Sequence, residues 1–321
     1  MSEKLSNFKK SRLFGPCLLV AMTVFFWVVF KLLSPSNFGT PKLMRDYLQT
    51  SIQYAVGGCG LYFIVVMGMF DMSVGSNIVL SSLVGVLLSR SFGYWGLIFG
   101  CILCGTLVGC FNGLLYSKLR IPSIIVTVGL MLVLESVANF VFTLDKSGFP
   151  GKLTNKSILA LGQAPYNYII AFAAFFVMYF ILKHTRIGTY CNAIGSNEYV
   201  ANNMGINTQK YKVLGFILLH TFVGVMALLT VSYGRGMLAV TGMSSMDRNF
   251  RPLMGTFFGV AFKKFKCPVA AIVVGEFIIT LIFNGLVAMN VPTTINDFIT
   301  GAVLLLIVTL TNRGAKGSVV K

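Results

Sequence analysis

The sequence predicts an all-α polytopic membrane protein with about ten membrane-spanning helices, within a range of eight to ten. The 321 residues are 56% hydrophobic and only 11% charged, with a mean hydropathy of +0.81. A soluble domain carries roughly 25% charged residues. The apolar residues gather into runs close to the ~20 residues that cross a bilayer core. This composition excludes a soluble enzyme, a disordered chain and a disulfide scaffold.

The apolar runs occur in a definite order along the chain. They are Leu13–Leu33, Tyr47–Phe70, Val74–Ser89, Tyr94–Leu119, Ser123–Leu144, Tyr166–Leu182, Val213–Tyr233, Asn249–Phe262, Pro268–Met289 and Phe298–Thr311. The third, eighth and tenth runs are short, which is typical of tilted, re-entrant or partly buried segments. The first run is too long for the core of a signal peptide and leads into Lys31, so we expect an uncleaved first span.

The basic residues predict an orientation. The chain has 26 Lys and Arg against 9 Asp and Glu, a net charge of +17. With the N-terminus inside and ten alternating spans, 16 of the 26 basic residues lie inside and 10 outside. Cytoplasmic loops of membrane proteins carry such an excess. We therefore expect both termini in the cytoplasm and a lipid bilayer, with no nucleic acid, as the surroundings of the chain.

Two polar loops separate the spans. Asp145–Pro165 is expected outside, and Arg186–Lys212 is the longest loop expected inside. The sequence contains no G-x-x-x-x-G-K-[ST] motif for nucleotide phosphates. If ATP drives this protein, another chain must hydrolyse it.

Glycines at helical spacing predict close helix packing. Gly105, Gly109 and Gly113 lie four residues apart in the fourth run, and Gly255 and Gly259 repeat this spacing later. Small residues on one face allow a neighbouring backbone to approach closely.

Few ionisable groups fall inside the apolar runs. They are Glu135, Glu276 and His220. Such groups are costly in a membrane unless they have protein or water partners. They serve either as coupling groups of an ion-driven carrier or as contacts between helices. Two scattered acids without a surrounding relay favour the second interpretation.

The residues for site chemistry are sparse. With two histidines in the chain, a metal site is not expected, and Cys101 and Cys104 lie inside an apolar run where cysteine acts as a small hydrophobe. No convincing His/Asp/Ser constellation is visible. We therefore expect no metal, no cofactor and no catalytic residue.

Three motifs outside the long inside loop point to a family. Phe70-Asp-Met-Ser-Val-Gly-Ser76 ends the second run, and Asp71 there is suited to capping the next helix. The segment resembles the D-[LM]-S-V-G-S signature of ABC-type monosaccharide importer permeases of the ribose, galactose and xylose type, within the branched-chain amino acid and sugar permease superfamily. Asn112–Pro122, followed by Thr127-Val-Gly129, is similar to that family's N-G-L-L…L-R-I-P…T-L-G block. Asn284-Gly-Leu286 resembles a later N-G-L.

A fourth motif falls in the long inside loop. Arg186–Asn207 resembles the family's R-x-G…A-x-G-x-N…A…G-I pattern. Ser196 or Asn197 can cap a short helix that Glu198 favours and Gly205 ends. The resemblance implies that residues 186–212 hold a coupling helix that docks on an ATPase. The residues assigned to this coupling are Gly195, Ser196, Asn197, Glu198, Ala201 and Gly205.

The resemblance implies one transmembrane permease domain over residues 1–321, of the type II importer kind, in the bacterial inner membrane. Its implied partners are ABC ATPase subunits, an extracytoplasmic sugar-binding protein and a second permease subunit. The expected helix-break residues are Asp71, Ser73, Gly75 and Ser76. The expected substrate-pathway residues are Gln53, Asn77, Asn112 and Asn284.

Two features depart from the family pattern. Residues 254–266 lack the family's glycine-rich stretch and carry a basic triplet, and Glu135 stands where the family often has a basic or apolar residue. Substrates other than a ribose-like sugar therefore stay open: a nucleoside, an autoinducer-type sugar or an amino acid. An ion-coupled carrier that uses Glu135 and Glu276 is the alternative from another class.

Overall fold

The computed structural model of the protein describes residues 14–292, followed by 295, 298–299, 301–302 and 305. Among these residues, the regular structure consists of helices α2 to α12, two short 3₁₀ helices and the helical residues 295, 298–299, 301–302 and 305, and the β pairing is an isolated bridge between Lys152 and Gly236. The chain divides into two compact units. We name Val56–Pro252 the central unit and Met1–Ala55 with Leu253–Lys321 the terminal unit.

Six described helices are long and apolar enough to cross a membrane. They are α2 (Phe14–Leu33), α4 (Val74–Leu119), α5 (Ser123–Leu144), α7 (Tyr166–His184), α10 (Thr208–Gly234) and α12 (Pro268–Ala288). Two further predicted runs correspond to α3 (Pro41–Val66) and α11 (Asp247–Ala261). The all-α polytopic class is confirmed. The tenth predicted run, Phe298–Thr311, lies largely outside the described residues.

Helix α4 joins the third and fourth predicted runs. Its 46 residues are interrupted at Gly93, whose φ of 56° and ψ of −133° are not helical. The chain folds back there. Gly100 in the second half comes so close to the first half that a Cβ added to it would lie 2.9 Å from the Cα of Gly85. The two halves of α4 therefore form a tight hairpin, and Gly93 provides a backbone conformation that other residues rarely adopt.

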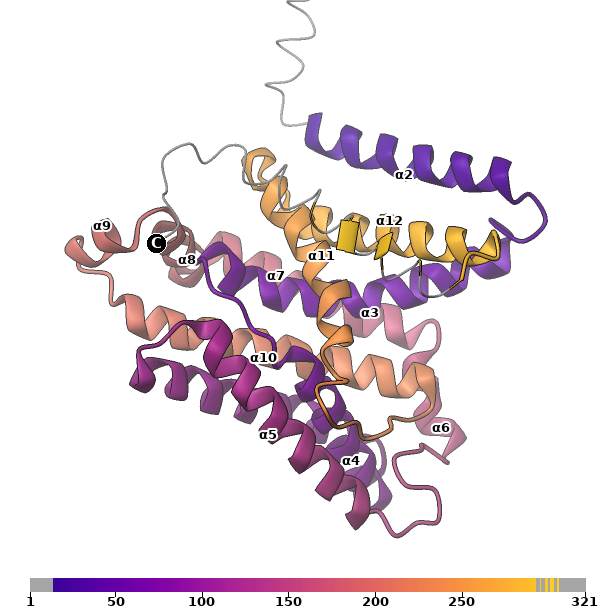
Figure 1. Ribbon diagram of the computed structural model, residues 1–321, viewed down its shortest axis with the longest axis horizontal. Coiled ribbons are helices and arrows are strands. Elements are labelled where there is room, and N and C mark those ends of the chain that lie inside the picture. Colours follow the sequence, from indigo (N-terminus) through magenta and orange to yellow (C-terminus); the bar gives the residue numbers. More distant parts are fainter. Residues whose placement is uncertain (1–13, 293–294, 296–297, 300, 303–304, 306–321) are drawn as a thin grey trace, which may run out of the picture. The chain divides into compact units, whose positions relative to one another are not determined.

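The second half of α4 packs against α10 through its glycines. A Cβ on Gly105 would lie 2.5 Å from the carbonyl oxygen of His220, and one on Gly109 would lie 2.8 Å from that of Phe216. Gly113 faces the start of α10 in the same way, so the two helices run antiparallel. Figure 1 shows α4, α5 and α10 side by side. The predicted glycine packing face is confirmed.

Another side of α4 faces outward. Leu103, Leu107, Phe111 and Leu114 are each more than half exposed and recur at helical spacing. An apolar stripe of this kind matches lipid tails rather than water.

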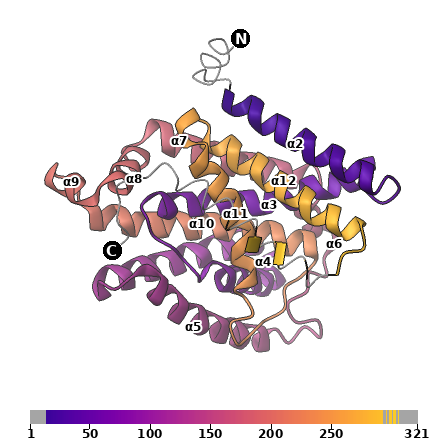
Figure 2. The same ribbon diagram turned by 45° about the horizontal axis from the view of Figure 1, so that its top comes forward.

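In the terminal unit, α2 and α12 lie side by side and parallel (Figures 1 and 2). Gly15 near the start of α2 contacts Phe265, and Phe30 near its end packs on Gly285. Phe38 and Tyr47 complete an aromatic core with Phe30. The parallel direction agrees with the predicted alternation of the first and ninth spans.

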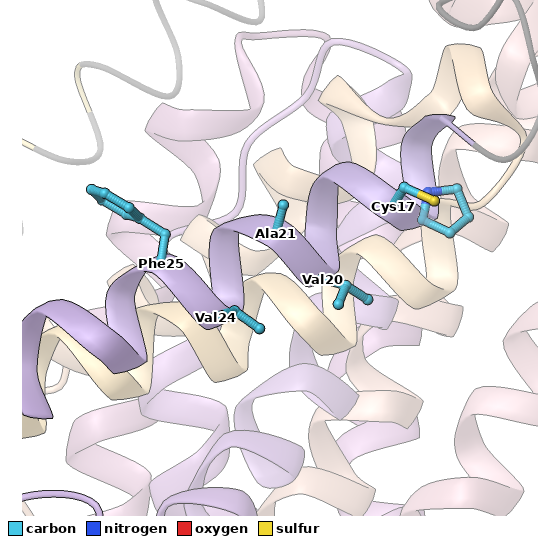
Figure 3. Close-up of a pocket in the computed structure, with 6 residues that line it drawn as sticks. Cys17, Val20, Ala21, Val24 and Phe25 are labelled. Atoms are coloured by element: carbon cyan, nitrogen blue, oxygen red, sulfur yellow. The ribbon is translucent and has the colours of Figure 1, made fainter.

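The outer face of α2 carries a shallow apolar hollow. Its lining is Pro16, Cys17, Val20, Ala21, Val24 and Phe25, and Figure 3 draws these residues along one helix. None of them offers the hydrogen bonds that would hold a polar ligand.

The loop between α5 and α7 is organised by one ion pair. Arg90 lies 3.2 Å from the Asp145 carboxylate and also donates to the carbonyl oxygen of Lys152 at 2.6 Å. Burial acts to raise the pKa of Asp145, but hydrogen bonds from Ser147, Gly151 and Arg90 outweigh it and hold the pKa below its ordinary value. The loop is thus tied to the end of α4's first half.

Candidate functional site

The chain leaves helical geometry between α3 and α4, at residues 67–73. In a membrane protein each backbone group freed by such a break needs a partner from the protein. Two side chains of α5 supply acceptors. The N–H of Phe70 donates to Ser123 Oγ at 3.1 Å, and the N–H of Met72 donates to Thr127 Oγ1 at 3.0 Å. We call residues 67–73 the helix break.

Asp71 is the centre of a buried polar network in this break. Its Oδ1 accepts the N–H of Ser73 at 2.7 Å and the hydroxyl of Ser73 at 2.6 Å. Its Oδ2 accepts from Asn112 Nδ2 at 2.8 Å and from His220 Nε2 at 2.9 Å. Ser76 closes the first turn of α4 by donating to the Ser73 carbonyl oxygen. The break is therefore joined to α10 and to both halves of α4.

The hydrogen bonds indicate which ring nitrogen of His220 carries the proton. Ser81 donates its hydroxyl hydrogen to Asn77 Oδ1 at 2.8 Å, which leaves Asn77 Nδ2 to donate to His220 Nδ1 at 2.7 Å. Because Nδ1 accepts, the ring proton sits on Nε2 and is donated to Asp71. We call Asp71, Ser73, Asn77, Asn112 and His220 the Asp71 network. Its members are at most 5% exposed.

The network contains a Ser, a His and an Asp, the residue types of a hydrolytic triad, and their spacing along the chain did not reveal that they meet. Their hydrogen bonds differ from those of a triad. Ser73 donates to Asp71 and not to His220, and both ring nitrogens of His220 are engaged by Asp71 and Asn77. Nucleophilic catalysis needs the base to contact the nucleophile. The arrangement holds helices together and does not activate a hydroxyl.

A second clamp holds the first turn of α4. Asn249 Oδ1 accepts the N–H of Gly75 at 2.5 Å, and Asn249 Nδ2 donates to the Met72 carbonyl oxygen at 2.7 Å. A Cβ on Gly75 would overlap the carbonyl oxygen of Ser245. Gly75 is therefore required for the close approach of the chain that leads into α11.

The two membrane carboxylates both accept backbone N–H groups. Glu135 on α5 is 1% exposed, and its two oxygens accept from Met243 and Ser245, each at 2.9 Å. Glu276 on α12 is fully buried and accepts from Gly255 at 3.1 Å. The predicted close packing at Gly255 is confirmed, since a Cβ there would overlap the Glu276 side chain.

The expected pathway residues fall in different units. Asn77 and Asn112 are brought together in the Asp71 network of the central unit. Gln53 and Asn284 belong to the terminal unit. Gln53 is 4% exposed, and Asn284 is half-buried and donates to the carbonyl oxygen of Thr280 at 2.8 Å. Their role as pathway residues stays a prediction.

The long inside loop folds into two short helices, α8 (Arg186–Ser196) and α9 (Glu198–Asn203). Asn197 caps α9, because its Oδ1 accepts the N–H of Val200 at 3.1 Å. Gly205 follows with a φ of +83°, the left-handed conformation that ends a helix. Of the two predicted caps, Asn197 is the one used.

Ser196 takes another bond. Its hydroxyl donates to the Asn192 carbonyl oxygen one turn back in α8. Helix α9 and Met204, the residue that follows it, expose apolar side chains: Tyr199 and Met204 are about three-quarters exposed and Val200 about half. Such a surface on a short helix is suited to a protein partner.

The short helices are fixed to the central unit at several points. Gly195 has no room for a Cβ, because the Val66 carbonyl oxygen at the end of α3 lies against it. Glu198 forms an ion pair at 2.5 Å with Lys212 in the first turns of α10. Ala201 is 2% exposed and anchors α9 inward. A displacement of α8 and α9 would therefore also displace α3 and α10, which they contact.

Within the described part of the chain, no three His, Cys, Asp or Glu side chains gather to hold a metal ion. Cys101 is buried against Gly85, and burial fits the packing role expected from its sequence context.

Sequence reasoning missed several members of the site. His220 was noticed as a polar group inside a span, but its partners are 108 to 149 residues away in the chain. In the sequence, Asn249 stands at the start of a predicted short span. Ser123 and Thr127 are spaced by one helical turn on α5, and this spacing was the available signal that both face the same neighbour.

Comparisons with known proteins agree with this architecture. Residues 43–308 match the family described as "Branched-chain amino acid transport system / permease component". The ribose import permease protein RbsC of Escherichia coli (strain K12) is 26% identical, covering 95% of this chain and 96% of the relative. The L-arabinose ABC transporter permease protein AraH of Azospirillum brasilense is 27% identical, covering 88% and 84%. An autoinducer 2 import system permease protein LsrC of Klebsiella pneumoniae is 28% identical, covering 89% and 83%.

A solved ABC transporter chain in an inward-facing conformation has a similar fold. Its TM-score is 0.53 at 12% identity, with 84% of this chain and 90% of that chain covered. At that identity the similarity concerns the fold alone. The resemblance carried by the Asp71 and Asn112 motifs is confirmed by the family match. This chain is a multi-pass membrane protein that belongs to the branched-chain amino acid transport system permease component family.

Proposed function

We propose that this chain is the membrane subunit of an ATP-driven importer that carries a ribose-like monosaccharide into the cytoplasm. The structural observation that carries the proposal is the helix break at residues 67–73. Interrupted helices at membrane depth are where transporters build substrate sites. This break contains the motif that resembles sugar permeases, and the relatives named for ribose, arabinose and autoinducer 2 support a sugar as the substrate.

The pathway residues act through a change of state. Asn77 and Asn112 are fully buried in the Asp71 network, so the network is closed in this arrangement. We propose that they face the pathway in another state, when α4 and α10 shift. Gln53 and Asn284 are the proposed pathway residues of the terminal unit. Amide side chains provide weak, multiple hydrogen bonds, which suits a substrate that must also leave.

The conformational change driven by ATP hydrolysis on the partner reaches this chain through α9. The proposed coupling residues lie in and beside α9. The exposed Tyr199 of α9 and Met204 just after it are proposed to contact an ATPase. The ion pair between Glu198 and Lys212 connects α9 to α10. His220 lies eight residues beyond Lys212, about 12 Å along the same helix at 1.5 Å per residue. A push on α9 is therefore transmitted along a rigid helix to the Asp71 network.

The proposal requires partners. ABC ATPase subunits hydrolyse ATP, and an extracytoplasmic binding protein selects and delivers the sugar. A second permease subunit completes the pathway. The chain lies in the inner membrane with both termini in the cytoplasm. The chain adopts two conformations that differ in free energy, and ATP binding and hydrolysis by the partner shift their populations.

One other substrate class is favoured by an observation. An autoinducer-type sugar is supported by the relatives named for autoinducer 2 import. The ion-coupled carrier is less well supported, because Glu135 and Glu276 both accept backbone N–H groups, as helix-joining residues do. A nucleoside or an amino acid has no such support in the geometry.

The test is purification of the tagged chain from its native membrane in mild detergent. We expect an ABC ATPase to co-purify, and we expect the binding protein encoded beside it to bind ribose more tightly than arabinose, an autoinducer-type sugar, adenosine or leucine. Absence of an ATPase in the purified complex would overturn the importer proposal. A binding protein that prefers leucine would overturn the sugar assignment alone.

A further inference from the structure

The carboxylate of Glu135 has a place in the site that the family pattern does not explain. Its two oxygens receive the N–H groups of Met243 and Ser245, so it binds the loop between α10 and α11 at two points. Met243 and the preceding Gly242 both have positive φ, of +68° and +69°. This turn directs the two N–H groups toward α5, and it leaves them without an alternative helical partner.

The loop held by Glu135 continues directly into the clamp on α4. The Ser245 carbonyl oxygen lies against Gly75, and Asn249 pairs with Gly75 and with Met72. Met72 lies between Asp71 and Ser73, and Gly75 follows them in the first turn of α4. The carboxylate on α5 therefore helps to position the end of the helix break and the start of α4.

We propose that Glu135 is a positioning residue for transport: it latches the loop 242–249 so that Asn249 holds the helix break at the distance the Asp71 network requires. The transport part of this proposal rests on the proposed function, whereas the latch itself is a property of the chain. The role differs from ion coupling, because both carboxylate oxygens are already occupied by backbone donors.

The test uses the assembled transporter with its ATPase and binding protein, in nanodiscs. The variants are Glu135→Leu, which removes both acceptors, and Glu135→Gln, which keeps one. Ser136→Ala is the matched control, because Ser136 is exposed one position along the same helix and bonds only to its own helix. Two readouts are compared at equal amounts of assembled complex: amide hydrogen exchange by mass spectrometry, and uptake per ATP hydrolysed.

In Glu135→Leu we expect exchange at Met243 and Ser245 to rise about 10- to 100-fold, since each loses a hydrogen bond to a charged acceptor. Exchange at Gly75 should rise with it, although Gly75 does not touch Glu135, and exchange in α7 should stay unchanged. Uptake per ATP should fall in the order wild type, Gln, Leu, with Ser136→Ala equal to wild type.

Faster exchange in the loop with no change at Gly75 would overturn the latch. Unchanged uptake per ATP in Glu135→Leu would overturn its role in transport. If wild-type complex shows no ATP-dependent uptake of any sugar, the proposed function fails, and the exchange result at Gly75 still decides on the latch.

Discussion

Removal of the Asp71 carboxylate should destabilise the central unit more than any exposed acid does. In Asp71→Ala, the Ser73 N–H and the His220 ring both lose their acceptor while staying buried. In contrast, Asn112 Nδ2 keeps Ser73 Oγ as an acceptor at 3.2 Å. A buried donor left unpaired costs about 1–3 kcal/mol, so two of them amount to about 4 kcal/mol. Since 1.4 kcal/mol is a factor of ten, the unfolding equilibrium should shift by about a thousandfold.

The assay is reversible unfolding of the purified chain in mixed micelles with increasing denaturing detergent, followed by helical circular dichroism. Asp71→Asn keeps one acceptor oxygen and should lose about half as much free energy. Asp46→Asn is the control, because Asp46 lies on α3 outside the network and is only partly buried, and its loss should stay within about 0.5 kcal/mol.

A double-mutant cycle tests directly whether Asp71 and His220 interact. Asp71→Ala and His220→Ala should each be destabilising, and the double variant should be less destabilised than their sum by about 1–3 kcal/mol, because the two share one contact. Losses that add within about 0.5 kcal/mol would show that the pair does not form. A small loss in Asp71→Ala alone would show that the network is open to water.

Three further predictions concern single contacts. Gly75→Ala should abolish uptake and lower the yield of folded chain, because its Cβ has no space, whereas Gly129→Ala, in open space on α5, should leave both measurements at wild-type level. Lys212→Ala should change stability by less than about 1 kcal/mol, since its partner is half exposed, but should lower uptake per ATP, and an unchanged ratio would contradict the route through α10. Because the pKa of Asp145 is lower in the folded chain, its stabilisation is present above the unfolded pKa of about 3.8 and is lost as the pH falls through the folded pKa. Thermal unfolding of Arg90→Ala should show a weaker loss below about pH 4, and equal pH profiles would contradict this assignment.

The elements were predictable because their signal is local. Apolar run length located the membrane-spanning helices, and α5 begins and ends at the predicted residues Ser123–Leu144. The glycines of α4 were predictable as a packing face because their spacing lies within one helix. The joining of the third and fourth runs into one element depended on Gly93, whose backbone conformation composition does not reveal.

The candidate site was predictable in part. Asp71 and Ser73 were found because the helix-capping signal is local, and Asn112 because its motif is short. Their meeting with His220 was not predictable, since it depends on the antiparallel packing of α10 on α4, which brings distant residues together. The latch from Glu135 was hidden for a related reason: its partners are backbone N–H groups, which any sequence provides.

The central claim is that ATP hydrolysed by a partner drives uptake through this chain. The direct measurement is uptake of labelled ribose into vesicles that contain the permease and its ATPase, with binding protein outside and ATP inside. Uptake should require ATP and the binding protein, persist when proton and sodium gradients are collapsed, and survive at a measurable rate in a Glu276→Gln variant. Uptake that proceeds without the ATPase and stops when the ion gradients collapse would contradict the claim.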